Sequence, residues 1–239
     1  MTQPLVRERI LQKRVFDVDI IVLGVRWYVS YRLSYRDLVK IMAEHGLDVA
    51  YSMILRWVIR YVPEFEKRWD WFRRRVGGLL RVDELHVCIR GQWHYLYRAL
   101  DQHGQTIDFL LRRERAIAAA QAFFRKALNS NGQRFAGTVT SDGHGPSRSA
   151  LWKLRREPVK WRNVRVRTNK YLNNIVEQDH RGIKARCGPL QGFKSFVTTA
   201  VTLAGFELAH RIRKRQFNFG RPGRRFGRNR KIDWRFALA

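Results

Sequence analysis

Residues 82–111, VDELHVCIRGQWHYLYRALDQHGQTIDFLL, hold three runs of strand-forming residues separated by two turns. The three runs cover residues 82–90, 93–100 and 106–111. Gly91 and Gly104 mark the two turns between them. Because connections this short join antiparallel neighbours, the stretch predicts a three-stranded antiparallel meander.

Helices and strands alternate after this meander. The expected elements are an alanine-rich helix at 115–128, a strand at 135–140, a loop and helix at 143–156, a short strand at 164–166, and helices at 172–186 and 196–215. Three strands, helix, strand, helix, strand, helix is the order of an RNase H-like fold. The sequence therefore predicts an α/β catalytic core with a mixed five-stranded sheet and helices.

Residues 17–62 predict three helices in front of this core. The apolar face of the first helix is expected to consist of Ile20, Leu23, Trp27 and Tyr31. Gly24 lies on the same predicted face, where it lowers helix propensity but allows a neighbouring helix to approach closely.

The ends of the next two helices carry local signals. Ser34 and Asp37 form a capping-box-like start for the second helix, which is expected to stop at Gly46. Ser52 is the expected N-cap of the third helix, which should end near Pro63.

Helix, tight turn, helix is the pattern of a helix-turn-helix motif, whose second element lies in a DNA major groove. Met53 and Arg56 are the expected base-reading residues, and Arg60 lies on the same outer side. An ordinary three-helix bundle with a solvated basic face fits the pattern nearly as well. The net charge favours the DNA-binding interpretation.

The domain organisation follows from these elements. It is expected to comprise an all-α helix-turn-helix domain at 1–63, a basic linker at 64–81, the RNase H-like core at 82–217 and a basic tail at 218–239. The Gly- and Arg-rich tail is predicted to be disordered without a polyanion.

The chain is strongly basic, with 48 Lys and Arg against 20 Asp and Glu, a formal net charge of +28. A polyanionic partner is the simplest explanation. A membrane surface is the competing explanation, but the basic residues are spread along the whole chain. Cys88 and Cys187 form no Cys-x-x-Cys pair, and no signal-peptide core is evident, so a reducing cytoplasm is expected.

Three acidic residues are candidates for a metal site. Asp83 lies in the first predicted strand, Asp142 ends a later one, and Glu177 lies in a helix. Carboxylates from three elements suit a pair of divalent ions that catalyses phosphoryl transfer. Simpler explanations exist for each: strand-end solubility beside Glu84 for Asp83, a turn for Asp142, and a solvated helical charge set for Glu177. Together these explanations leave the order and spacing unexplained.

The strings VDELHVCIRGQWHYLYRALD, NNIVEQDHRGIK and GFKSF resemble a DDE transposase with an integrase catalytic core, and the insertion-sequence-six family of bacterial transposases in particular. The resemblance covers about residues 17–215. It implies that Asp83, Asp142 and Glu177 bind two Mg²⁺ ions, with Mn²⁺ as a substitute. It also implies that Lys184 contacts DNA near this site.

Other residues are assigned roles by the same resemblance. Asn173 and Asn174 would position the helix or a phosphate, and His180 and Arg181, on the predicted face of Glu177, would contact substrate. An ordinary His on the helix surface is an equally good interpretation of His180. The Gly-His-Gly that follows Asp142 and the Arg-rich tail depart from the family pattern.

The resemblance further implies metal-dependent 3′-end cleavage and strand transfer of an insertion sequence by a replicative, cointegrate-forming route. Expected partners are double-stranded DNA, as terminal inverted repeats and target, and further copies in a homodimer or larger assembly at the bacterial nucleoid. A non-catalytic DNA-binding regulator, a domesticated transposase and a nuclease that does not join ends are the alternatives.

Four tryptophans divide between two expectations. Trp152 and Trp161 are interleaved with basic residues, which favours a grip on DNA, although a place in the core is also open for them. Trp27 and Trp93 are expected in the core.

Overall fold

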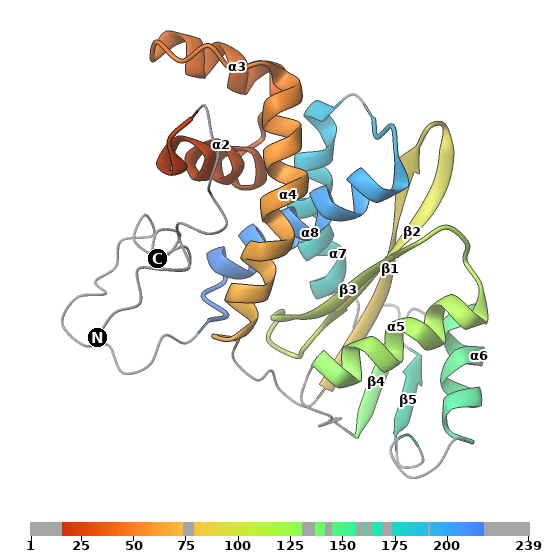
Figure 1. Cartoon of the computed structure of the whole chain (residues 1–239). Helices are drawn as coiled ribbons and strands as arrows, with labels where there is room; N and C mark the ends of the chain where they lie inside the picture. Colours follow the sequence, from red (N-terminus) through yellow and green to blue (C-terminus); the bar gives the residue numbers. More distant parts are fainter. Residues whose placement is uncertain are drawn as a thin grey trace, which may run out of the picture. The chain divides into compact units, whose positions relative to one another are not determined.

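The computed structural model describes residues 16–73, 79–130, 137–141, 145–156, 161, 164–168, 174–190 and 192–217 of the chain (Figure 1). The chain divides into two compact units. The helical unit comprises Met1–Arg74, Arg186–Gln191 and Val197–Ala239, and the sheet unit comprises Arg75–Ala185 and Gly192–Phe196.

The sheet unit contains a mixed five-stranded sheet of order β3-β2-β1-β4-β5. Its strands are β1 (Leu79–Ile89), β2 (Gln92–Leu100), β3 (Thr106–Arg112), β4 (Thr138–Ser141) and β5 (Arg165–Thr168). The first three strands pair antiparallel, while β4 pairs parallel with β1 and β5 pairs parallel with β4. The predicted α/β, RNase H-like sheet is therefore confirmed.

The hairpin between β1 and β2 has a two-residue turn. Arg90 and Gly91 both have positive φ, 51° and 75°, as a type I′ turn requires. β1 begins at Leu79, three residues before the predicted start, because Leu79 to Val82 pair with β4. Residues 79–81 therefore belong to the sheet and not to the predicted linker.

One face of the sheet packs on α5 (Ile117–Ser130) and α6 (Gly145–Leu154) (Figure 1). Val82 and Tyr97 from the strands join Phe123, Phe124 and Leu151 from these helices in a single buried core. Trp161 is buried in the same core, so its place is structural and the predicted DNA contact is wrong.

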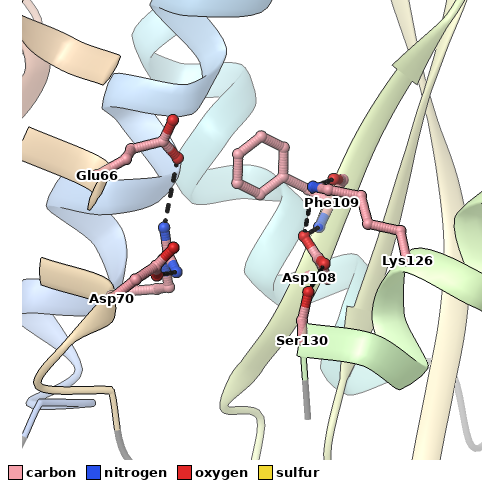
Figure 2. Close-up of polar contacts among 7 residues, drawn as sticks. Glu66, Asp70, Asp108, Phe109, Lys126 and Ser130 are labelled. Atoms are coloured by element: carbon pink, nitrogen blue, oxygen red, sulfur yellow. Dashed lines mark hydrogen bonds and ion pairs between the residues drawn. The ribbon is translucent and has the colours of Figure 1, made fainter. Parts of the chain in front are cut away.

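A small network of polar contacts joins the edge strand β3 to α5. The carboxylate of Asp108 accepts hydrogen bonds from Lys126 Nζ (2.7 Å) and Ser130 Oγ, as Figure 2 shows. Lys126 also donates to the carbonyl oxygen of Phe109 at 2.7 Å. Asp108 is almost completely buried, so these donors replace the water that it loses.

The helical unit is built from α2 (Val18–Ser30), α3 (Tyr35–Glu44), α4 (Tyr51–Asp70) and the part of α8 (Phe196–Arg213) from Val197 onward. A short 3-10 turn, η2 (Gly188–Leu190), follows α7 (Asn174–Cys187). None of the described helices is both long and apolar enough to cross a bilayer.

Two glycines allow close helix packing in the helical unit. A Cβ at Gly24 would lie 2.7 Å from Met42 Cε, which confirms the predicted close approach. A Cβ at Gly205 of α8 would lie 2.6 Å from Val29 Cγ1 and 3.2 Å from Val62 Cγ2. α8 therefore packs directly on α2 and α4, although the prediction placed it in the 82–217 core.

An ion-pair cluster adds to this packing. The guanidinium of Arg211 lies 3.5 Å from the carboxylates of both Glu66 and Asp70 (Figure 2). Arg211 is buried, whereas the side chains of Glu66 and Asp70 are 26% and 52% exposed, so the cluster joins α8 to α4 at the border of the buried interface.

The helix boundaries confirm one predicted cap and correct another. Ser34 and Asp37 form the complete capping box, with Ser34 N–H to Asp37 Oδ2 at 2.8 Å. The N-cap of α4 is Ala50, not Ser52, and no side chain caps it. The exposed Tyr51 already belongs to the helix, which therefore begins two residues earlier than predicted.

α4 also continues through Pro63 to Asp70, so the predicted end near Pro63 and the linker that follows are wrong. A proline inside a helix costs about 3 kcal/mol. Phe65 and Trp69 are both buried on the continuing apolar face, and each buried aromatic side chain returns about 1.5–3 kcal/mol. Their burial outweighs the lost backbone hydrogen bond.

The buried face of α2 is shifted by one residue along the sequence from the predicted face. Its buried residues are Ile21, Gly24, Val25, Tyr28 and Val29. Of the predicted face, Tyr31 is 51% exposed and Ile20, Leu23 and Trp27 are only half-buried. Apolar residues surround this helix, and the close packing at Gly24 selects which of them face inward.

Candidate active site

Two consecutive acids on β1 face opposite sides of the sheet, because side chains alternate along a strand. Asp83 shares its face with Leu85, and its side chain is 15% exposed. Its Oδ1 accepts the backbone N–H of Glu84 at 2.8 Å, and its Oδ2 lies 3.6 Å from Nδ1 of His180 on α7. The face of Asp83 is therefore the one on which α7 packs.

Glu84 faces α5 and α6 instead. It pairs with Arg115 Nε, and its Oε1 accepts a hydrogen bond from Ser147 Oγ of α6 at 2.8 Å. Both carboxylate oxygens are thus occupied on the far side of the sheet from Asp83. Of the two adjacent acids, only Asp83 is placed to act together with a residue of α7.

A buried ion pair docks α7 on this face. Arg98 of β2 lies directly opposite Asp83 in the strand register. Its Nη2 donates to Asp179 Oδ2 at 2.7 Å, and the two side chains are 0% and 9% exposed. Removing one partner of such a pair costs about 3–5 kcal/mol, because the other charge remains buried.

The two sides of α7 differ in exposure. Val176, His180 and Ile183 are buried, whereas Glu177, Arg181 and Lys184 are exposed. His180 therefore does not share the exposed face of Glu177, and its predicted position there is wrong. Residues three apart on a helix are about 60° out of line, which is enough to turn His180 toward Asp83.

Burial, together with the positive charges of Arg98 and Lys184, lowers the pKa of His180 to about 3, although the carboxylate of Asp179 opposes the shift. The imidazole is therefore neutral at physiological pH. Its approach to Asp83 is a contact between a neutral ring and a carboxylate and not an ion pair.

The described residues place two of the three predicted metal ligands. Asp83 lies within β1, and Glu177 lies in the first turn of α7. Asp142 lies outside the described residues. The last pair of the parallel β1–β4 ladder is Val82 with Ser141, the residues that immediately precede Asp83 and Asp142 in the sequence.

The carboxylate oxygens of Asp83 and Glu177 are ligands that a hard divalent cation prefers. Within the part of the chain that the structure covers, no three acidic, His or Cys side chains converge on one point. Asp142 is not among these residues.

The predicted DNA-contacting residues are spread over both units. Arg56 and Arg60 are exposed one turn apart on α4, and Met53 is half-buried near its start. Arg181 and Lys184 are exposed on α7. Asn174 is the first residue of α7, and Asn173 lies outside the described residues.

Sequence reasoning missed the Arg98–Asp179 pair and the contacts of Glu84, because both join residues far apart in the chain. Only the predicted meander gives a hint of the Arg98 contact, because its register places Arg98 opposite Asp83. Trp93, expected in the core, is 63% exposed instead, because its side of the hairpin extends beyond the helices.

Comparison with known proteins identifies the family. A family model described as a DDE domain matches residues 79–216. The transposase for insertion sequence-like element IS431mec from Staphylococcus aureus is 35% identical over 200 residues, covering 84% of this chain and 87% of that protein. The transposase for insertion sequence element IS257 in transposon Tn4003, also from Staphylococcus aureus, is 34% identical with the same coverage.

Two solved structures resemble the chain more distantly. The catalytic core domain of BIV integrase is 21% identical, covers 53% of this chain and 80% of its own, and has a TM-score of 0.38. A chain of the simian T-cell lymphotropic virus intasome in complex with PP2A regulatory subunit B56 gamma is 11% identical, covers 75% of this chain and 66% of its own, and has a TM-score of 0.39.

The family model spans more than half of the chain, and both transposases exceed 30% identity over most of both lengths. The chain therefore belongs to the DDE transposases of bacterial insertion sequences, in the insertion-sequence-six family, and is a polynucleotidyl transferase.

Proposed function

We propose that this transposase cleaves the 3′ ends of its insertion sequence and joins them to target DNA at a site formed by Asp83, Asp142 and Glu177. The observation that supports this most strongly is the docking of α7 on the Asp83 face of β1 through Arg98 and Asp179. The parallel pairing of Val82 with Ser141 supports the inclusion of Asp142.

Two divalent ions, Mg²⁺ or Mn²⁺, would be held by these carboxylates. When bound, they would neutralise the charge that develops on the attacking and leaving oxygens. The chain itself positions the DNA. Exposed Arg181 and Lys184, one and two turns beyond Glu177, would hold phosphates beside the scissile bond.

The two steps differ in their bond balance. Water first hydrolyses a phosphodiester at the element end, which leaves a 3′-hydroxyl on the element and a 5′-phosphate on the flanking strand. The 3′-hydroxyl then attacks a target phosphodiester in line, so that the joining step forms one phosphodiester for the one it breaks and releases a 3′-hydroxyl on the target. No covalent enzyme intermediate is needed. A replicative route that forms cointegrates, and a homodimer or larger assembly that holds two ends together, are part of this proposal.

End recognition is assigned to α3 and α4. Met53, Arg56 and Arg60 would read the terminal inverted repeats, with Asn173 and Asn174 near the cleavage site. The net charge of +28 supports tight, salt-dependent binding to DNA. Double-stranded DNA as substrate would place the protein at the nucleoid in the bacterial cytoplasm.

The test uses the full chain and labelled duplexes that carry the inverted repeats flanking its own gene. Asp83→Asn, Asp142→Asn and Glu177→Gln should each abolish cleavage and leave duplex binding within about twofold. Glu114→Gln, a change at an exposed residue that follows β3, is the matched control. Near-normal cleavage by any one triad variant would refute the assignment.

Precut ends separate joining from cutting. Wild-type protein should join a precut 3′ end to a target plasmid, as seen on a denaturing gel. Nicked plasmid without joined product would identify a nuclease and refute the transfer step.

A further inference from the structure

One half of a sheet face carries an exposed aromatic cluster that the proposed reaction does not use. His86 and Tyr95 are opposite each other on β1 and β2, as are Cys88 and Trp93. All four share the face of Glu84, by the alternation of side chains along a strand. Trp93 is 63% exposed, His86 and Cys88 are also exposed, and Tyr95 is half-buried.

The aromatic rings form one unit. The His86 ring lies 6.2 Å from the Trp93 ring and 5.2 Å from the Tyr95 ring between centroids, at interplanar angles of 70° and 73°. Packing on both neighbours fixes His86 between them. The guanidinium carbon of Arg115 also lies 6.0 Å from the Tyr95 centroid.

The charges on this part of the sheet are positive. Arg112, exposed on β3, is opposite Tyr95 in the register. Glu84 marks the end of the covered half of the face, where its carboxylate is occupied by Arg115 and Ser147. A partner for this surface must therefore bring negative charge. The same face of a second copy is a poor candidate, because it would bring another exposed Arg112 against this one.

We propose that Trp93, Tyr95 and His86, with Arg112, form a stacking platform for unpaired DNA bases. Aromatic side chains on an open sheet face bind single-stranded nucleic acid in this way, whereas the bases of a duplex are already stacked on each other.

The spacing supports an unpaired strand. Trp93 and Tyr95 are two residues apart on β2, which places them about 6.6 Å apart along the strand. That is about twice the 3.4 Å spacing of bases along one strand of a duplex. Bases that stack on both rings must therefore be spread apart.

This site goes beyond the cleavage and joining proposed above, and its test needs neither. Fluorescence anisotropy of the full chain measures binding to a labelled 20-nucleotide oligothymidine and to a labelled 20-base-pair duplex at the same salt concentration. Trp93→Ala should weaken oligothymidine binding about tenfold, as expected for one lost base–aromatic stack, and change duplex binding by less than about twofold.

Two further variants control the result. Trp93→Phe retains an aromatic ring and should recover most of the binding. Trp71→Ala removes a tryptophan that is 88% exposed at the C-terminal end of α4, outside the platform, and should leave oligothymidine binding unchanged.

Cys88 provides an independent readout, because it lies opposite Trp93 and is exposed. Saturating oligothymidine should slow alkylation of Cys88 by iodoacetamide at least fivefold. Equal losses on both DNAs, or no loss on either, would overturn the proposal. Light scattering measures the mass of the assembly that Trp93→Ala forms. If that mass falls while DNA binding is unchanged, the surface is an interface between copies of the chain, and the proposal is also overturned.

Discussion

Breaking the buried Arg98–Asp179 pair should destabilise the protein strongly. Asp179→Asn leaves the guanidinium of Arg98, which is 0% exposed, without its 2.7 Å charged partner. The expected cost is about 3–5 kcal/mol, because the buried charge can regain water only by local unfolding. At about 2–4 °C per kcal/mol for a chain of this size, the melting temperature should fall by about 6–20 °C.

A double variant separates stability from alignment. Arg98→Met with Asp179→Leu replaces both charges by apolar groups of similar volume, which should restore the free energy of unfolding to within about 1 kcal/mol of the wild type. Cleavage should remain about a hundredfold reduced, because the polar contact that fixes α7, and with it Glu177, relative to Asp83 is lost.

The assays are thermal unfolding by circular dichroism and cleavage of a labelled element end. Lys67→Met breaks the exposed Lys67–Glu64 pair, whose side chains are 72% and 38% exposed, and should cost less than about 1 kcal/mol. The reasoning fails if Asp179→Asn is no more harmful than this control. It also fails if the double variant recovers cleavage together with stability.

Three further predictions concern other parts of the fold. Asp108→Ala removes a buried acceptor and should lower the free energy of unfolding, measured in urea, by about 2–3 kcal/mol. Lys126→Ala should lower it by less than about 1 kcal/mol because Lys126 is 45% exposed, and equal losses for the two variants would contradict this. Gly205→Ala should destabilise by about 1–3 kcal/mol despite better helix propensity, and a raised melting temperature would refute the predicted clash. Without DNA at pH 8, iodoacetamide should modify Cys88 and spare Cys187, because burial raises the pKa of Cys187 to about 11 and leaves only about one in 10³ of its thiols as thiolate. Mass spectrometry of the two cysteine-containing peptides measures the modification, and equal modification of both would contradict this.

Local signals made part of this fold predictable. The Ser34 cap depends on a residue three positions away, and the turn at Gly91 depends on two residues between apolar runs. Neither needs information from elsewhere in the chain. The start of β1 could not be predicted in the same way, because Leu79 becomes a strand residue through its pairing with Thr138 on β4.

Burial was less predictable than secondary structure. Apolar residues occupy two adjacent stripes of α2, and only packing against Met42 at Gly24 decides between them. The exposure of Trp93 has a similar cause. Its strand period places it correctly on one face, but the sequence does not reveal that α5 and α6 leave this end of the face uncovered.

The adjacent acids Asp83 and Glu84 show how the alternation of side chains along a strand gives neighbouring carboxylates different partners in the candidate site. Alternation along β1 turns Asp83 toward α7 and Glu84 toward α6, where Ser147 donates to it at 2.8 Å. A shift of one residue in the β1 register would exchange these faces. Glu84 would then lie beside α7 with a longer side chain, and Asp83 would face Ser147 and fall short of it. The pairing of β1 with β2 is therefore a condition for the site itself, because it determines which carboxylate is presented to α7.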